Sequence, residues 1–337
     1  MRSPNFDNLL KVFRREVPDR PTLFEFILNP RLYLHDSEYR VEPAWATREW
    51  ARMAAMANMR LGYDYACMVG SDFAFPTKPV EMKSSRSMSE MAVITDRASF
   101  DAYIWPEPET CDYSHISTVA EYLPSGAKVI VYGPGGVLEN VMALTGYEGL
   151  CYLLADDPQL VEDIFSEVGS RFIRFYALCA RERGVGALFC CDDWGFKSQT
   201  MIPPALMRKY LFPWHKEIVA TMHAAGYPAL LHSCGNLQDV MDDIIDDLRY
   251  DAKHSYEDTI CPVEDIYQRY HARIAILGGI DVDFLCRATP DEVSARAQAL
   301  LAQSATRGGY ALGSGNSIPA YVPDANYFAL TSAAMEG

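Results

Sequence analysis

His232 and Cys234 are residues whose types and spacing could do chemistry together. They stand two residues apart in the segment LLHSCGN (230–236), at the end of a short apolar run. If that run is a strand, the two side chains project from the same face, because side chains alternate across a strand. An imidazole nitrogen and a thiolate sulfur on one face can converge on one Zn²⁺. The alternative is that Cys234 fills core space and His232 bonds a neighbouring strand.

A catalytic zinc site takes three protein ligands and keeps a fourth position open, so a third ligand must come from elsewhere in the chain. The segment CCDD (190–193) ends another apolar run, and alternation directs either Cys190 with Asp192 or Cys191 with Asp193 inward. The acids could instead cap helices or lie on the surface. The candidates for the third ligand are Cys191, Asp193, Glu257 and Asn316.

Lys253 and His254 follow each other late in a further apolar run. A lysine buried there needs a partner such as Glu257 or Asp281, because an unpaired buried charge is strongly disfavoured. Either basic residue could act in acid–base chemistry or form half of a structural ion pair. We treat His254, Glu257 and Asp193 as candidate catalytic groups, and Lys253 and Asp281 as candidate substrate contacts.

Other side chains near these segments could line a substrate pocket. Trp194 and Phe196 come directly after CCDD and could form a wall for a planar or methyl-bearing molecule, or could simply close the end of the fold. Asn140 comes shortly after GPGG (133–136), which lacks the spacing of a phosphate loop and is predicted to be a tight turn. We count Asn140, Trp194 and Phe196 as candidate substrate contacts.

These segments lie at the ends of predicted strands. Short apolar runs alternate with longer amphipathic stretches, which is the pattern of strands alternating with helices around a parallel sheet. The sequence therefore predicts an α/β fold of the (β/α)8 TIM-barrel type. Its eight predicted strands are 22–28, 64–70, 128–135, 187–194, 228–236, 251–258, 274–281 and 309–317.

The active site of such a barrel lies at the carboxyl ends of its strands. Polar residues follow the predicted strands at that end, which favours an enzyme over an inert scaffold. We expect one domain over residues 1–337, with N-terminal insertions in the long stretch 74–126. The predicted helices include 158–183, 203–225, 237–246, 262–270 and 290–305.

The composition narrows the range of partners. The 337 residues carry 45 acidic against 30 basic side chains, a formal net charge of −15, and such a surface repels phosphate backbones and anionic lipids. We therefore expect a small-molecule substrate and neither a nucleic-acid nor a membrane partner. The N-terminus lacks a signal-like apolar core, and nine cysteines make a poor disulfide framework, so we expect a cytoplasmic protein with free or ligating thiols.

The order of the segments LHSCGN, AILGGID and YALGSGNSIPAYVPDANYFAL resembles the uroporphyrinogen decarboxylase superfamily. The resemblance runs from RPTLFEFILNPRLYL to the last predicted helix and is strongest from about residue 185 onward. It implies a (β/α)8 barrel. Members are either metal-free tetrapyrrole decarboxylases or zinc-dependent methyltransferases that work with a corrinoid protein.

The decarboxylase branch is matched poorly. Of the two arginines that bind substrate carboxylates in that branch, FILNPRLY keeps at most Arg31. Asp72 matches the acid after the second strand and joins the candidate catalytic groups. Val141 stands where the branch has a tyrosine, and Ser314 stands where it has a histidine. Most of its carboxylate-binding set is therefore missing.

The methyltransferase branch fits at one place and departs at another. Its zinc-binding H-x-C is matched by His232 and Cys234, but Asn316 replaces its third ligand, a late cysteine. The leading hypothesis is a zinc-dependent enzyme that moves a methyl group between a small methylated substrate or thiol and a corrinoid (cobalamin) protein. The alternatives are a decarboxylase of uroporphyrinogen or a related polycarboxylate, and a non-catalytic ligand-binding barrel. The sequence does not give the oligomeric state, and a homodimer stays open.

Overall fold

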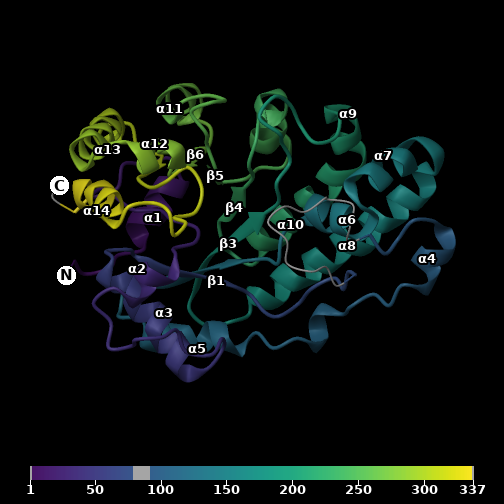
Figure 1. Ribbon diagram of the computed structural model, residues 1–337, viewed down its shortest axis with the longest axis horizontal. Coiled ribbons are helices and arrows are strands. Elements are labelled where there is room, and N and C mark those ends of the chain that lie inside the picture. The colour runs from purple at the N-terminus through teal and green to yellow at the C-terminus, as the bar shows by residue number, and fades with distance from the viewer. Residues whose placement is uncertain (1, 79–91, 336–337) are drawn as a thin grey trace.

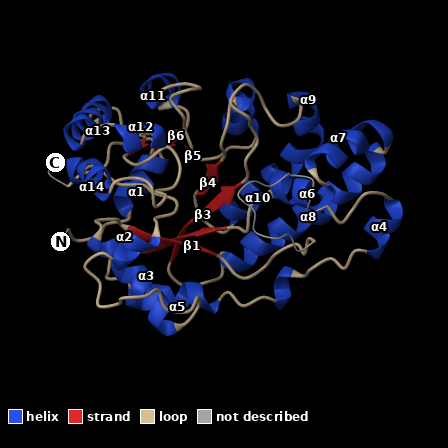
Figure 2. Ribbon diagram, in the orientation of Figure 1, coloured by secondary structure: helices blue, strands red, loops and turns tan. Residues whose placement is uncertain are grey.

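The computed structural model describes residues 2–78 and 92–335 and contains one parallel sheet. Its seven strands are paired in the order in which they occur in the chain. Figure 2 shows the strands at the centre of the molecule with helices around them. The strands are β1 (Tyr65–Val69), β2 (Lys128–Tyr132), β3 (Val185–Cys191), β4 (Ala229–His232), β5 (Ala252–His254), β6 (Ala275–Leu277) and β7 (Tyr310–Ala311).

The sheet is buried on both faces, as all-parallel sheets usually are. All seven residues of β3 and all four of β4 are buried, which is why these segments read as unbroken apolar runs in the sequence. The predicted α/β fold with a parallel sheet is therefore confirmed.

The first predicted strand, 22–28, does not form a regular strand, so the expected count of eight is not reached among the described residues. The backbone N–H and carbonyl of Glu25 bond to the hydroxyl of Tyr65, at 2.7 and 2.8 Å, instead of to a strand backbone. The segment meets the other end of the sheet through two isolated parallel bridges, Leu23 with Leu312 and Leu28 with Ile318. The structure therefore matches the predicted (β/α)8 barrel only in part.

The region before β2 carries most of the additional elements. The predicted insertion 74–126 holds three short helical elements, while its residues 79–91 lie outside the described part of the chain. Figure 1 shows α3 and α5 packed on one side of the sheet. The elements up to β2 are α1 (Asp7–Phe13), α2 (Pro30–Leu34), α3 (Arg48–Arg60), α4 (Arg97–Ala102), η1 (Pro108–Thr110) and α5 (Ser114–Tyr122).

The later helices follow the strands largely as predicted. Thr289 begins α13 with a capping box in which Glu292 bonds back to the Thr289 N–H. The predicted helical stretch 237–246 is helical from Gln238 onward, but it consists largely of a 3₁₀ helix (η3, Gln238–Val240) and a π-helix (η4, Asp243–Asp247). The remaining elements are α6 (Val137–Thr145), α7 (Tyr147–Asp156), α8 (Pro158–Cys179), α9 (Pro204–Leu206), η2 (Met207–Leu211), α10 (Phe212–Ala224), α11 (Val263–Tyr270), α12 (Val282–Arg287), α13 (Pro290–Ser304) and α14 (Asp324–Ala333).

Aromatic side chains fill the space below the carboxyl ends of β4 and β5. The ring of Phe26 lies 4.7 Å from that of His232, and the ring of Phe24 lies 5.3 Å from that of His254. Phe189 of β3 packs between them, 5.6 Å from Phe24 and 5.2 Å from Phe26. The rings of His232 and His254 therefore pack against a cluster of aromatic side chains. Across the described residues, no helix has both the length and the apolar character needed to cross a bilayer.

Candidate metal centre

Three side chains from two neighbouring strand ends bring an oxygen, a nitrogen and a sulfur atom together. Asp193 follows β3, His232 ends β4 and Cys234 lies just beyond it, and their ligand atoms all lie within 4.8 Å of one another. His232 Nε2 is 3.5 Å from Cys234 Sγ and 3.7 Å from Asp193 Oδ1. The side chain of His232 is 7% exposed and that of Asp193 is 33% exposed. The cluster is buried on the histidine side and accessible on the aspartate side.

The sheet register shows which acid of CCDD faces this cluster. Cys191 of β3 is the partner of His232 of β4, so their side chains lie on the same face, and Asp193 continues that face. Asp192 points the other way, where it accepts a hydrogen bond from His215 Nε2 of α10 at 2.9 Å. Of the two alternatives left open by the sequence, Cys191 with Asp193 is the inward pair.

Hydrogen bonds continue past β3 and β4 and hold the two loops together. Cys234 N donates to Asp193 Oδ1 at 2.8 Å, and Gly195 N donates to Cys234 O at 3.2 Å. Gly235 has a φ of +88°, and a Cβ there would lie 2.0 Å from Gly195 O. Only glycine fits this close approach, so the glycine after H-x-C brings the loop of β4 against that of β3.

A buried hydrogen-bond relay fixes the tautomer of His232. His254 Nε2 lies 3.2 Å from the carbonyl oxygen of Ser314, and a carbonyl only accepts, so this nitrogen carries a proton. Burial lowers the pKa of His254 to about 3, so its ring is neutral and Nδ1 accepts. His232 Nδ1, 2.9 Å from His254 Nδ1, therefore donates. His232 Nε2 is left with a lone pair facing Cys234 and Asp193, as a metal ligand requires.

The sulfur of Cys234 has two further polar neighbours. Asn316 Nδ2 donates to Cys234 Sγ at 3.3 Å, and Ser255 Oγ lies 3.5 Å from the same sulfur. The Asn316 amide is oriented by Ser317 N, which donates to its Oδ1 at 2.8 Å. Asn316 thus offers an N–H to the sulfur and no oxygen to a metal. Burial raises the pKa of the Cys234 thiol to about 12, so a metal that binds there must displace its proton.

Lys253 is 2% exposed and lies beside this cluster. Its ammonium donates to the carbonyl oxygens of Ser233 and Ser255, at 3.2 and 2.9 Å, and lies 4.4 Å from the centre of the Tyr256 ring. Carbonyls and an aromatic face thus take the place of the acidic partner expected from the sequence. Burial lowers the pKa of Lys253 to about 8.

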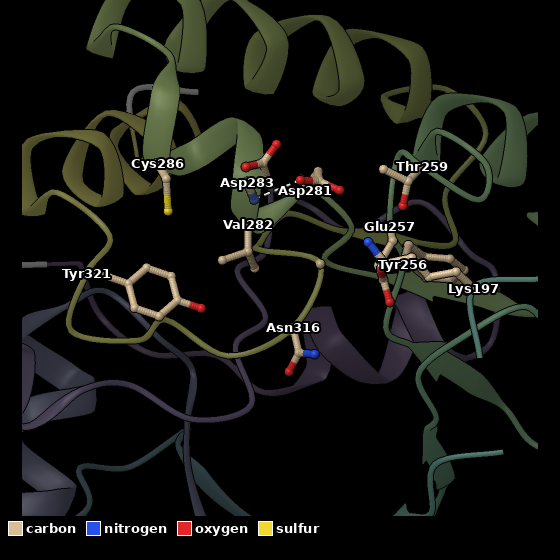
Figure 3. A pocket seen from close by; sticks show the side chains of 11 residues that line it. Lys197, Tyr256, Glu257, Thr259, Asp281, Val282, Asp283, Cys286, Asn316 and Tyr321 are labelled. Carbon is tan, nitrogen blue, oxygen red and sulfur yellow. Dashed lines mark hydrogen bonds and ion pairs between the residues drawn. The ribbon is translucent and has the colours of Figure 1, made fainter. Parts of the chain in front are cut away.

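A cavity of about 550 Å³ opens beside Asn316, and Figure 3 shows Tyr321 and Lys197 on opposite sides of it. Three of the predicted residues line it: Asn316, Glu257 and Asp281. Glu257 lies 4.0 Å from the ammonium of Lys197. Asp281 accepts three backbone N–H groups, two of them at the start of α12, so its carboxylate is already satisfied. The lining residues are Lys197, Tyr256, Glu257, Thr259, Asp281, Val282, Asp283, Cys286, Gly315, Asn316 and Tyr321.

The family of the chain follows from its sequence. The family model described as uroporphyrinogen decarboxylase (URO-D) matches residues 68–337, which is well over half of the chain. The chain belongs to the URO-D family. No curated protein sequence matches it significantly.

Of two solved structures similar to this URO-D family chain, one shares its fold. A methyltransferase from Methanosarcina mazei superposes with a TM-score of 0.72 over 99% of this chain and 99% of its own, at 15% sequence identity. The putative vitamin-B12 independent methionine synthase from Listeria monocytogenes covers 94% of this chain and 97% of its own, at 12% identity and a TM-score of 0.47. At such identities the first likeness shows a shared fold alone, and the second is too distant to support a conclusion.

The two aromatic residues predicted to contact substrate lie in different surroundings. Trp194 is fully buried on the outer side of the sheet, with its ring 5.5 Å from Phe212 and 4.8 Å from His215. Phe196 is 37% exposed, and its ring lies edge-on to Tyr147 at 5.7 Å. Neither ring lines the cavity beside Asn316.

Three more predicted residues lie outside the described cluster of ligand atoms. Asp72 is exposed and lies beside Cys111, whose pKa is raised by burial and by this acid. Asn140 donates its amide N–H groups to carbonyls of the 133–136 turn at 2.7 and 3.1 Å. Cys191 faces inward, but its buried sulfur is directed at a backbone carbonyl 3.9 Å away.

Sequence reasoning missed two polar residues that contact the cluster or its supports. Ser255 follows His254 directly, and nothing in its sequence position distinguishes it. Glu25 is 3% exposed and stands as the one acid in the apolar run TLFEFIL. A lone acid in such a run is a signal that could have been used, because buried carboxyl groups need partners.

Proposed function

We propose that this chain is a zinc-dependent methyltransferase in which Asp193, His232 and Cys234 hold the metal. The observation that carries the proposal is the convergence of one oxygen, one nitrogen and one sulfur atom within 4.8 Å at the carboxyl ends of β3 and β4. Membership of the URO-D family and the fold shared with a methyltransferase support the assignment of the reaction.

The two distances from His232 Nε2 to the other donor atoms are close to those of tetrahedral zinc, and all three donor atoms lie within 4.8 Å of one another. Bonds of about 2.0 Å to nitrogen and oxygen and about 2.3 Å to sulfur give tetrahedral edges of about 3.5 Å for N···S and about 3.3 Å for N···O. His232 Nε2 is 3.5 Å from Cys234 Sγ and 3.7 Å from Asp193 Oδ1. Small movements of Asp193 would complete the set, and its exposed side leaves a fourth position for substrate.

Zinc bound by these residues would lower the pKa of a coordinated thiol or water and so supply a nucleophile near neutral pH. The chain's own residues prepare the site for this. His254 keeps the lone pair of His232 Nε2 directed at the site, and the amide of Asn316 stabilises negative charge on Cys234. The hydroxyl of Ser255 adds a second polar contact to the same sulfur.

The cavity beside Asn316 is the place we assign to the small-molecule substrate. It holds three acids, Glu257, Asp281 and Asp283, and one lysine, Lys197. This lining disfavours a polycarboxylate and so disfavours decarboxylation of uroporphyrinogen. We propose a corrinoid protein as the methyl-carrying partner.

Elemental analysis together with a methyl-transfer assay tests the proposal. Wild-type protein is expected to hold zinc in a one-to-one ratio and to consume methylcobalamin in the presence of small thiols, seen as a change in visible absorbance. The double variant His232→Ala with Cys234→Ala should lose both properties. Cys191→Ala, which removes a neighbouring inward thiol outside the cluster, should keep both.

Each other outcome contradicts a part of the proposal. A protein that holds no zinc, with activity unaffected by the double substitution, contradicts the metal site. Zinc without methyl transfer to any thiol contradicts the reaction. Formation of coproporphyrinogen from uroporphyrinogen by metal-free protein would establish the decarboxylase alternative.

A further inference from the structure

Glu25 and Ser314 form a buried, hydrogen-bonded pair near the candidate metal centre. Ser314 N donates to Glu25 Oε1 at 2.6 Å, and Ser314 Oγ lies 2.7 Å from Glu25 Oε2. Glu25 is 3% exposed and Ser314 is fully buried. A carboxyl group in such a place is costly unless it is neutral and hydrogen-bonded. The pair joins two parts of the chain that are far apart in the sequence.

The hydroxyl of Ser314 has one proton and two neighbouring oxygens. Besides Glu25 Oε2, the carbonyl oxygen of Asn316 lies 2.9 Å from Ser314 Oγ. Burial raises the pKa of Glu25 to about 8, so its carboxyl group is protonated at neutral pH. The carboxyl O–H then donates to Ser314 Oγ, and the Ser314 hydroxyl donates to the Asn316 carbonyl. Every polar atom of the pair is satisfied in this arrangement.

One branch from Ser314 leads to the nitrogen ligand. The carbonyl oxygen of Ser314 accepts from His254 Nε2 at 3.2 Å and from Gly279 N at 2.8 Å, so its position is held from two sides. His254 Nδ1 in turn meets His232 Nδ1 at 2.9 Å. The tautomer of His232 therefore depends on where the Ser314 carbonyl lies.

A second branch leads to the sulfur ligand. The Ser314 hydroxyl holds the backbone of Asn316, whose side-chain Nδ2 donates to Cys234 Sγ at 3.3 Å. We propose that Glu25 and Ser314 are positioning residues that orient both the nitrogen and the sulfur ligand of the metal site. Neither touches the metal or the substrate. This inference rests on the proposed function.

Two measurements on purified full-length variants test this proposal. The first is the ¹⁵N NMR signal of His232 in metal-free protein, which reports the nitrogen that carries the proton. The second is zinc affinity by competition with a chelator. Glu25→Leu and Ser314→Ala should mix the two His232 tautomers and weaken zinc binding about 10- to 100-fold, the usual effect of losing an outer partner of a metal ligand.

Glu25→Gln provides the rescue. Its side-chain carbonyl can accept from Ser314 N, and its amide N–H can donate to Ser314 Oγ, as the protonated carboxyl group does. This variant should keep the wild-type His232 signal and zinc affinity. Tyr65→Phe is the matched control, because it removes the hydrogen bonds to the Glu25 backbone, at 2.7 and 2.8 Å, but leaves the carboxyl group in place. It should lose stability and keep zinc affinity.

The outcomes separate this proposal from the proposed function. Wild-type protein without zinc overturns the proposed function, while the His232 signal in metal-free variants still decides the positioning role. An unchanged signal and affinity in Ser314→Ala overturns the positioning role. Equal losses of affinity in Tyr65→Phe and Glu25→Leu would also overturn it, since they would show a purely structural effect. If Glu25→Leu does not fold, the two single variants Ser314→Ala and Glu25→Gln are sufficient to test the proposal.

Discussion

Asp192 and Asp193 are consecutive residues with opposite surroundings. Asp192 is fully buried, and its two oxygens accept from the backbone N–H groups of Leu138 and Glu139, each at 3.0 Å, and from His215 Nε2 at 2.9 Å. Asp193 is one-third exposed and accepts from the backbone N–H of Cys234. One carboxylate is saturated with donors, and the other keeps lone pairs free beside His232 and Cys234.

This difference separates a structural acid from a candidate ligand more clearly than burial alone. Asp192 sits at the first turn of α6, where its charge interacts favourably with unpaired backbone N–H groups. A Cβ on Gly136 would lie 2.0 Å from the Cβ of Asp192, so the helix approaches the carboxylate as closely as a glycine permits. Asp193 makes no comparable contribution to helix packing, and its oxygens face the histidine and the thiol.

Replacing Asp192 should have the largest effect, and on stability. Asp192→Ala leaves two backbone N–H groups and His215 Nε2 without their acceptor in a buried place, and each such loss costs about 1 to 3 kcal/mol. We expect the free energy of unfolding to fall by about 3 to 5 kcal/mol, comparable to breaking a buried ion pair. Urea unfolding of metal-free protein measures it.

The same measurement on Asp193→Ala is the control. That variant should lose less than about 1 kcal/mol, as expected of a partly exposed side chain away from packed features. If the two variants lose equal stability, the number of hydrogen bonds that each carboxylate accepts does not distinguish their structural roles.

Replacing Asp193 should have the next largest effect, and on metal binding. Asp193→Ala removes one of three donor atoms, so zinc affinity should fall more than about 100-fold, beyond the 10- to 100-fold range typical of outer partners. Competition with a chelator measures the loss. Glu257→Ala, which removes an acid from the cavity, should bind zinc as tightly as wild type. A larger loss in Glu257→Ala than in Asp193→Ala would transfer the third-ligand role to Glu257.

The sequence could predict features that depend on neighbours along the chain. Strand alternation placed His232 and Cys234 on one face and reduced CCDD to two alternatives, but only the pairing of β3 with β4 shows that Asp193 is the inward acid. The lone acid Glu25 was visible in the sequence, but its pairing with Ser314 could not be predicted, because the two residues are 289 positions apart. The first predicted strand, 22–28, was expected from an apolar run, yet the backbone of Glu25 bonds there to the side chain of Tyr65.

Replacing Asn316 should have the smallest effect, and it tests whether positions 193 and 316 serve the same corner of the metal site. Asn316 stands where the resembling methyltransferases have a cysteine ligand, and its Nδ2 lies 3.3 Å from Cys234 Sγ. A thiolate is a far better zinc ligand than an amide, so Asn316→Cys in the Asp193→Ala background should restore zinc affinity about tenfold or more under reducing conditions.

Asn316→Ser in the same background is the matched control, because it removes the amide without adding a thiolate. This variant should not regain zinc affinity, because serine supplies no thiolate to replace the missing carboxylate of Asp193. Equal affinities for the cysteine and serine variants would mean that position 316 cannot reach the metal, and that the oxygen of Asp193 replaced the cysteine at a different corner of the site. A tenfold gain for cysteine alone would show that the two positions serve the same corner, so that the β3 loop supplies here what the β7 loop supplies in those methyltransferases.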